Sequence, residues 1–289
     1  MGRMFWQTND IWQGASWAAV DYTGRYKMVQ YFAKQFYSPV LVSPFGTAVH
    51  GKFETYVVND NAFAADALAG DIVFNMQSWS DGLVGSWTEQ YTAAPGSATS
   101  VFNCTWQAML ARGNCPDGTK CFLTVDVYAG SSSTAGAQPV ASNYLLLSPF
   151  LDVTTMADPQ LKVTNVALAP DAGAVDGEVP FEVTITSVAS AAFVWIETQF
   201  AGRWSDNGML MVAKKHGSAS AGGDGGGGVG SGGGTGATRT LTFYSDSTVN
   251  GRLTAKALKE TLQRPTWFPM STKGGLWSLV DTSPEYTAS

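Results

Sequence analysis

The apolar residues near the start of the chain follow a helical spacing. After Gly24 they share one helix face: Met28, Tyr31, Phe32 and Phe36. Pro39 is expected to end this helix, because proline disfavours helical backbone in the residue before it. Upstream, residues 4–7 are predicted to form a short buried strand and residues 8–23 a loop. A unit of this size rarely folds alone, so its apolar face needs a partner surface.

From Val40 the apolar period changes from helical to alternating, which is typical of half-buried β-strands. The expected strands are Val40–Phe45, Glu54–Val58, Asp71–Trp79, Ser100–Trp106, Cys121–Tyr128 and Asn143–Leu147. Polar turn sequences such as Ser80-Asp81-Gly82 separate several of them. Short strands with regular turns and no repeated helices predict an antiparallel sandwich over residues 40–158.

A second all-β unit is expected in residues 159–289. Its predicted strands are Leu161–Ala167, Pro180–Thr186, Phe193–Phe200, Met209–Ala213 and Thr240–Tyr244. Gly202–Gly208 is predicted to be a polar hairpin turn, because Asp, Asn and Gly tolerate left-handed backbone. Residues 217–238 are mostly Gly, Ser, Ala and Thr, which predicts a disordered insertion inside this unit. Leu253–Leu262 is expected to form a short helix, and Trp267, Phe268 and Trp277 suggest a tail that packs back.

The composition limits the classes of partner. Charged residues make up 14% and hydrophobic residues 45% of the 289, which is typical of a folded protein. The net charge of −6 and the lack of a basic stripe argue against nucleic acid and against an anionic membrane surface. No apolar run approaches the roughly 18 residues that span a bilayer. No signal peptide is expected. The sequence is compatible with a secreted, a lysosomal or vacuolar, and a cytoplasmic location. It leaves open whether Met1 is the true start.

Thiols and imidazoles are few. The cysteines lie in one stretch: Cys104, Cys115 and Cys121. Their spacing fits no zinc pattern, and either one short disulfide with a spare thiol or three reduced thiols is compatible with it. The two histidines, His50 and His216, are too few for a multi-histidine metal site or a histidine-based nucleophile system. No metal and no cofactor are therefore expected.

One short motif concerns modification. Asn103-Cys104-Thr105 fits the N-glycosylation sequon. The same motif also arises by chance, so the sequence leaves glycosylation open.

The stretch before the helix combines indole rings with amide and carboxylate groups. Its polar and aromatic residues include Trp6, Asn9, Asp10 and Trp12. An indole covers the apolar face of a sugar ring, while amides and carboxylates bind hydroxyl groups. This pattern favours a sugar-binding site, although a buried strand followed by a loop with core tryptophans would give the same pattern.

The same stretch carries a family resemblance. Its motifs, in chain order, are Trp6-Gln7-Thr8-Asn9-Asp10-Ile11-Trp12-Gln13, Ser16-Trp17, Asp21-Tyr22, Gly24-Arg25-Tyr26-Lys27-Met28 and Tyr31-Phe32-Ala33-Lys34. From Gly2 to Ser43 they resemble, almost without gaps, the last barrel strand and helix of the β-mannosidases of glycoside hydrolase family 2. A weaker resemblance continues through the two β-sandwich domains that follow the barrel in that family.

The resemblance implies a mostly β fold in three parts. Residues 1–39 would be the last strand–helix unit of a (β/α)8 TIM barrel, which is incomplete here. Residues 40–158 and 159–289 would be two immunoglobulin-like β-sandwich domains. The family also implies a retaining exo-glycosidase that hydrolyses terminal, non-reducing β-D-mannose residues, with β-mannoside oligosaccharides or glycoprotein-derived glycans as partners. The oligomeric state and the preferred linkage are not indicated.

The catalytic carboxylates are not expected in this chain. A retaining glycosidase needs two carboxyl groups about 5–5.5 Å apart. In the family that the chain resembles, both are glutamates on earlier barrel strands, and residues 1–39 contain no glutamate. The chain is therefore expected to be a C-terminal portion that is inactive alone.

What remains is one wall of a sugar site. Side chains at the C-terminal end of a barrel strand face the active site. Trp6 is expected to stack under the terminal sugar, and Asn9 and Asp10 to bind hydroxyl groups or to fix the loop. Trp12 either lines the pocket or packs structurally.

A competing hypothesis is a non-catalytic β-sandwich module that binds carbohydrate or protein. Exposed aromatic residues on one sheet face would favour it, with Trp79, Trp87 and Trp106 as the candidates.

Overall fold

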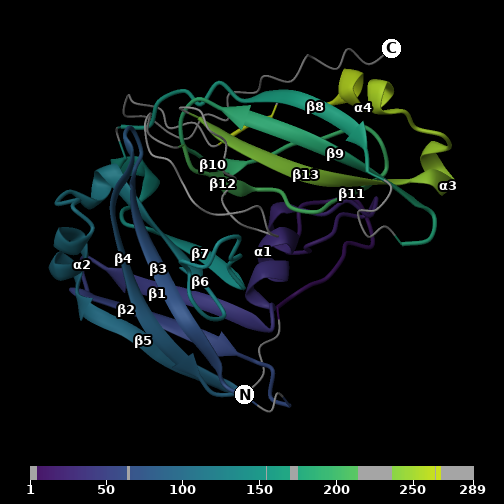
Figure 1. The fold of residues 1–289 in the computed structure, drawn as a ribbon. Coiled ribbons are helices and arrows are strands. Elements are labelled where there is room, and N and C mark those ends of the chain that lie inside the picture. Colours follow the sequence, from purple (N-terminus) through teal and green to yellow (C-terminus); the bar gives the residue numbers. More distant parts are fainter. Residues whose placement is uncertain are drawn as a thin grey trace.

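The computed structural model describes residues 5–63, 66–153, 155–169, 175–213, 236–263 and 265–267. Most of its regular elements are β-strands, arranged as two groups of sheets with one helix between them (Figure 1). None of the helices in these ranges is long and apolar enough to cross a bilayer. The chain is thus mostly β, as the alternating pattern predicts.

The first group packs a three-stranded sheet, β1-β2-β5, against a four-stranded sheet, β4-β3-β6-β7. The strands are β1 (Val40–Thr47), β2 (Lys52–Asn59), β3 (Leu68–Ser78), β4 (Gly82–Ala93), β5 (Ser97–Thr105), β6 (Cys121–Val127) and β7 (Ala141–Leu146). Every ladder is antiparallel. Alternate residues from both sheets meet in one core, in which Phe53, Phe74 and Val125 are fully buried. Trp87 stacks on Phe74 with ring centroids 4.9 Å apart.

Short helical turns complete this sandwich. They are α2 (Trp106–Arg112), η1 (Gly118–Lys120) and η2 (Phe150–Asp152). The Thr105 hydroxyl accepts a hydrogen bond from the Ala108 amide and so caps the N-terminus of α2. The predicted strand Ser100–Trp106 therefore ends one residue early.

The second group pairs a four-stranded sheet, β11-β13-β9-β8, with the short ladder β10-β12. Its elements are β8 (Lys162–Leu168), β9 (Glu178–Ser187), β10 (Ala191–Val194), β11 (Gly202–Trp204), β12 (Met209–Met211), β13 (Ala237–Asp246), α3 (Ser247–Asn250) and α4 (Ala255–Thr261). Its core joins Phe181 and Phe243 of the large sheet to Met211 of the small one and Leu258 of α4. Residue pairs along β9 and β13 face each other from end to end.

Three expectations for this second group need correction. The strand expected at 193–200 lies earlier in the chain: β10 runs from Ala191 to Val194, and its ladder contains a register shift at Phe193, whose φ is 52°. The predicted hairpin turn at 202–208 contains the strand β11, whose backbone pairs with β13. Ala237 and Thr238 belong to β13, so the glycine-rich insertion cannot extend to 238. Residues 217–235, Phe268 and Trp277 lie outside the described ranges, whereas Trp267 packs against the second core.

Helix α1 (Met28–Phe36) lies between the two sandwiches (Figure 1). On one side the Gln35 amide donates to the carbonyl of Ser142 on β7 at 3.0 Å. On the other side the Lys34 ammonium donates to the carbonyl of Ser205 at 3.1 Å. The expected apolar face is thus used in part: Tyr31 is buried, while Phe36 is 45% exposed.

The two sandwiches also touch directly. A small apolar cluster brings Trp79 and Phe122 of the first together with Ala192 and Val212 of the second, and Val153 of the connection lies among them. The rings of Trp79 and Phe122 are 4.2 Å apart at their centroids. The two sandwiches therefore pack as neighbours through this cluster, and α1 joins them through its hydrogen bonds to both.

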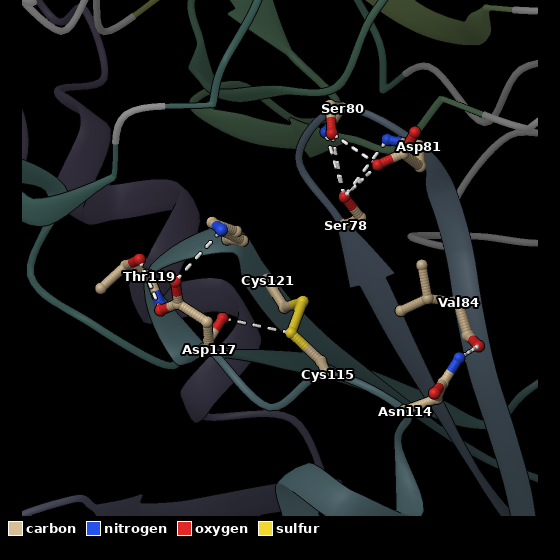
Figure 2. The surroundings of a disulfide bond; sticks show 10 residues. Ser78, Ser80, Asp81, Val84, Asn114, Cys115, Asp117, Thr119 and Cys121 are labelled. Carbon is tan, nitrogen blue, oxygen red and sulfur yellow. Dashed lines mark hydrogen bonds and ion pairs between the residues drawn. A yellow bond between two sulfur atoms is a disulfide. The ribbon is translucent and has the colours of Figure 1, made fainter.

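A disulfide closes the short loop after α2. It joins Cys115 to Cys121, and the Asp117 carboxylate in the loop between them accepts the amide and the hydroxyl of Thr119 (Figure 2). Cys104 is a half-buried free thiol. Of the two alternatives that the sequence leaves open, the structure has the single short disulfide with a spare thiol.

Replacing both Cys115 and Cys121 by serine is expected to lower the free energy of unfolding by about 2 kcal/mol. The bridge restricts the unfolded chain, and a loop this short gives an effect near the lower end of the usual range. Urea unfolding measures the change, with Cys104→Ser as the matched control that leaves the bridge intact. Equal stability of the double variant and the parent would show that the bridge contributes nothing.

Candidate functional site

The segment before α1, residues 5–27, forms a compact loop held by backbone hydrogen bonds. The Asp10 amide donates to the Val20 carbonyl at 2.9 Å, and the Val20 amide donates to the Thr8 carbonyl at 2.9 Å. The Lys27 amide donates to the Ala19 carbonyl at 2.8 Å. The loop is therefore tied to the first residues of the helix unit.

The buried strand expected at 4–7 is wrong for the described residues 5–7. They form no ladder, and Trp6 is 78% exposed. A strand needs a neighbouring strand for its amides and carbonyls, and the structure places none beside these residues. The peptide bond between Trp6 and Gln7 is cis.

Large apolar side chains crowd the surface of this segment. Trp6, Trp12 and Trp17 are 78%, 69% and 82% exposed, and Ile11 is 86% exposed. Single exposed apolar residues are common, but such a density within twelve residues marks an interaction surface. The indole of Trp12 packs closely on Gly14, since a Cβ on Gly14 would lie 2.8 Å from the ring.

Asp10 is engaged inside the loop. Its Oδ2 lies 2.8 Å from Lys27 Nζ, and its Oδ1 accepts the hydroxyl of Ser16. The hydrogen bonds from Lys27 and then from Ser16 hold the pKa of Asp10 below its usual value. The side chain is only 6% exposed. These contacts favour the loop-fixing role of Asp10 over direct contact with a ligand, whereas Asn9 beside it is exposed.

The lowered pKa of Asp10 gives a pH dependence with a definite sign. The ion pair stabilises the loop at every pH above the unfolded Asp pKa and is lost as the pH falls through the lowered folded pKa. The protection of residues 8–20 against hydrogen exchange, relative to the intrinsic exchange rate at each pH, is therefore expected to fall on acidification, and Asp10→Asn should show the lower protection already at neutral pH. Asp60→Asn, an exposed change elsewhere, is the control. Exchange in Asp10→Asn that matches the parent at neutral pH would contradict this role.

Asp21, the other carboxylate of the segment, is also engaged. Burial alone would raise its pKa, but hydrogen bonds from Thr23 and the Arg25 amide outweigh burial and lower it. Both carboxylates of the segment are thus held in the ionised form. Neither resembles the general acid of a glycosidase, whose pKa must be raised.

Helix α1 packs against the hairpin at residues 202–208. Asn207 is 2% exposed and binds both the amide and the carbonyl of Ile196, at 3.0 and 2.8 Å. Tyr31 of α1 is buried in the second core, where it lines one small pocket with Trp204 and Asn207, and burial raises the pKa of its hydroxyl. Gly208 has a φ of +71°, and a Cβ there would lie 2.7 Å from Met28 Cγ. The sequence marks this hairpin as a turn but gives no sign that a helix docks on it.

A small pocket opens between the N-terminal segment and the second sandwich. Its lining includes Arg25, Tyr26, Trp195 and Glu197. Its volume of about 60 Å³ is far below the 300–1,000 Å³ of usual ligand sites. It is therefore not a sugar site.

The sandwich tryptophans and the potential metal ligands offer no second site among the described residues. Trp79, Trp87 and Trp106 are 2%, 8% and 3% exposed, so none of them offers a carbohydrate platform on a sheet face. Among the residues placed by the structure, no group of three or more His, Cys, Asp and Glu could hold a metal ion. The exposed aromatic loop remains the candidate site.

Comparisons with known proteins concern the family and the fold of the chain. A family model for an Ig-fold domain, Ig_mannosidase, matches residues 156–216. The β-mannosidase of Mus musculus is 31% identical over 225 residues, which are 74% of this chain and 23% of that protein. The β-mannosidase of Rattus norvegicus is 29% identical over a similar share. The chain is related to the C-terminal part of the family 2 β-mannosidases.

Solved structures show the same fold. The β-D-mannosidase of Dictyoglomus thermophilum superposes with a TM-score of 0.59 at 16% identity, over 92% of this chain and 26% of that one. An exo-chitosanase of Amycolatopsis orientalis superposes with a TM-score of 0.54 at 14% identity. The chain spans about a quarter of the length of the β-mannosidases that it matches.

Proposed function

We propose that this chain is the C-terminal part of a retaining β-mannosidase. Residues 1–39 supply the last strand–helix unit of its catalytic barrel, and residues 40–158 and 159–289 form two immunoglobulin-like domains behind it. The observation that carries the proposal is the exposure of Trp6, Ile11, Trp12 and Trp17, on a segment that resembles the barrel end of the β-mannosidases. An apolar surface of this kind is stable when something covers it, and the neighbouring barrel strands, together with a bound sugar over Trp6 and Trp12, would do so.

The loop then supplies one wall of the site for the terminal sugar. Trp6 stacks under the apolar face of the mannose ring, and the exposed amide of Asn9 binds a hydroxyl. Asp10 holds the loop through Lys27 and Ser16. Trp12, braced on Gly14, lines the rim.

The two catalytic carboxyl groups come from elsewhere in the longer enzyme. In residues 5–39 the carboxylates Asp10 and Asp21 are engaged and have lowered pKa values. Burial raises the pKa of Asp126, but this group lies on β6 of a sandwich and is bonded to the Ser142 hydroxyl at 2.6 Å. A pair of carboxyl groups suited to retention is thus not formed by these residues. The chain alone is therefore inactive, and its substrates are those of the whole enzyme: β-mannoside oligosaccharides or glycans released from glycoproteins.

The stereochemistry of the reaction tests the proposal. The longer protein that contains this chain should release β-mannose first from the non-reducing end of a β-mannoside, as followed by proton NMR before mutarotation. Release of α-mannose first would refute retention. Hydrolysis of an α-mannoside reporter in place of the β-mannoside would refute the substrate class.

A further inference from the structure

The chain contains a single Asn-X-Ser/Thr sequence, Asn103-Cys104-Thr105. It lies at the end of β5, which is an edge strand of the sheet β1-β2-β5. Asn103 and Thr105 are exposed, whereas Cys104 between them is half-buried and packs against the first core. The alternation of the strand therefore turns the asparagine side chain toward solvent.

The Asn103 side chain makes no contact that a modification would disturb. Within the part of the chain that the structure places, its side chain takes part in no hydrogen bond; its backbone lies opposite Glu54 in the ladder with β2. Asn59, at the other end of β2, differs: it is 2% exposed and its amide donates to the Ala93 carbonyl. A bulky group on Asn103 would displace no packed side chain.

The disulfide is an independent observation that points to the same chemistry. Cys115–Cys121 lies twelve residues beyond the sequon in the same sandwich. Stable disulfides form in oxidising compartments such as the lumen of the endoplasmic reticulum, and N-linked glycans belong to proteins that pass through it. An exposed sequon next to a disulfide therefore meets both conditions for glycosylation.

We propose that Asn103 carries an N-linked oligosaccharide. The co-reactant is a lipid-linked oligosaccharide pyrophosphate. Asn103 Nδ2 forms a bond to its anomeric carbon and loses one proton, the bond from that carbon to the pyrophosphate oxygen breaks, and the lipid pyrophosphate leaves. The glycan would project from the exposed edge of β5 and prevent that edge from pairing with another chain. In the folded protein the Thr105 hydroxyl accepts the Ala108 amide, so transfer precedes the formation of α2.

The test is a mass measurement on the 289-residue chain, produced behind a cleavable secretion signal in a eukaryotic cell line. Both the secreted and the cell-retained protein are analysed, so that a folding defect does not hide the modification. The expected result is the added mass of one oligosaccharide. A peptide N-glycosidase should remove it and leave aspartate at position 103.

Four variants separate the sequon from its surroundings. Asn103→Gln and Thr105→Ala should lose the added mass entirely, while Thr105→Ser, which preserves both the sequon and a hydroxyl cap, should keep it. Asn165→Gln is the matched control, because Asn165 is also exposed on a strand but is in no sequon. An unmodified parent chain in both fractions, or added mass that survives Asn103→Gln, would overturn the proposal.

Discussion

Replacing Trp6 by alanine in the longer enzyme is expected to lower kcat/KM for a β-mannoside by on the order of 100-fold. The indole belongs to residues 4–7, which we assign to the end of the last barrel strand, and it is 78% exposed and thus free to meet a ligand. Loss of the ring would remove the stacking surface and the orientation that it gives the sugar. Steady-state kinetics with a β-mannoside reporter measures the change.

Trp17→Ala is the matched control for that experiment. Trp17 belongs to the same segment and is 82% exposed, but no sugar contact is assigned to it. Its replacement is expected to change kcat/KM much less. Near-normal activity of Trp6→Ala would contradict the stacking role, and equal losses in both variants together with lower thermal stability would mean that the tryptophans only pack.

Replacing Asn207 by alanine is expected to lower the free energy of unfolding of the 289-residue chain by about 2–4 kcal/mol. The variant leaves the amide and the carbonyl of Ile196 without their partner, and each unpaired buried backbone group costs about 1–3 kcal/mol. It also removes a side chain that lines the same small pocket as Tyr31, so α1 should dock less firmly on the second sandwich. Urea unfolding gives the loss of stability, and hydrogen exchange of α1 reports its docking.

Asn165→Ala serves as the comparison for Asn207→Ala. Asn165 is exposed on β8, and changes at such positions usually stay within about 0.5 kcal/mol. Equal stability of the two variants would show that the Asn207 network does not hold the hairpin. A loss of stability without faster exchange in α1 would limit its role to the second sandwich.

The alternating pattern of the sequence predicted most strands, because inward apolar residues at a period of two are a local signal. Ile72, Phe74 and Met76 on β3 are all fully buried, as their spacing predicts. The sequence does not indicate the strand β4, because its apolar residues are few: Trp87 and Tyr91 face the core, and polar residues or glycines fill most other positions. Its place is fixed by pairing with β3, which is a tertiary effect that the sequence of β4 does not reveal.

The candidate site shows the same division between local and tertiary information. Trp6, Asn9, Asp10 and Trp12 stood out by residue type, and the structure places them in or beside one loop. The partners of Asp10 could not be predicted, because the contact with Lys27 spans seventeen residues and depends on the path of the loop. The docking of Tyr31 at Asn207 joins residues far apart in sequence, so no local pattern could indicate it.

The most direct test of the account compares β-mannoside hydrolysis by the longer protein that carries this chain with hydrolysis by the 289-residue chain alone. The account predicts an active longer protein and a folded but inactive chain, because this chain supplies one wall of the sugar site and neither catalytic carboxyl group. Hydrolysis by the 289-residue chain alone would contradict it, since the carboxyl groups would then lie within these residues.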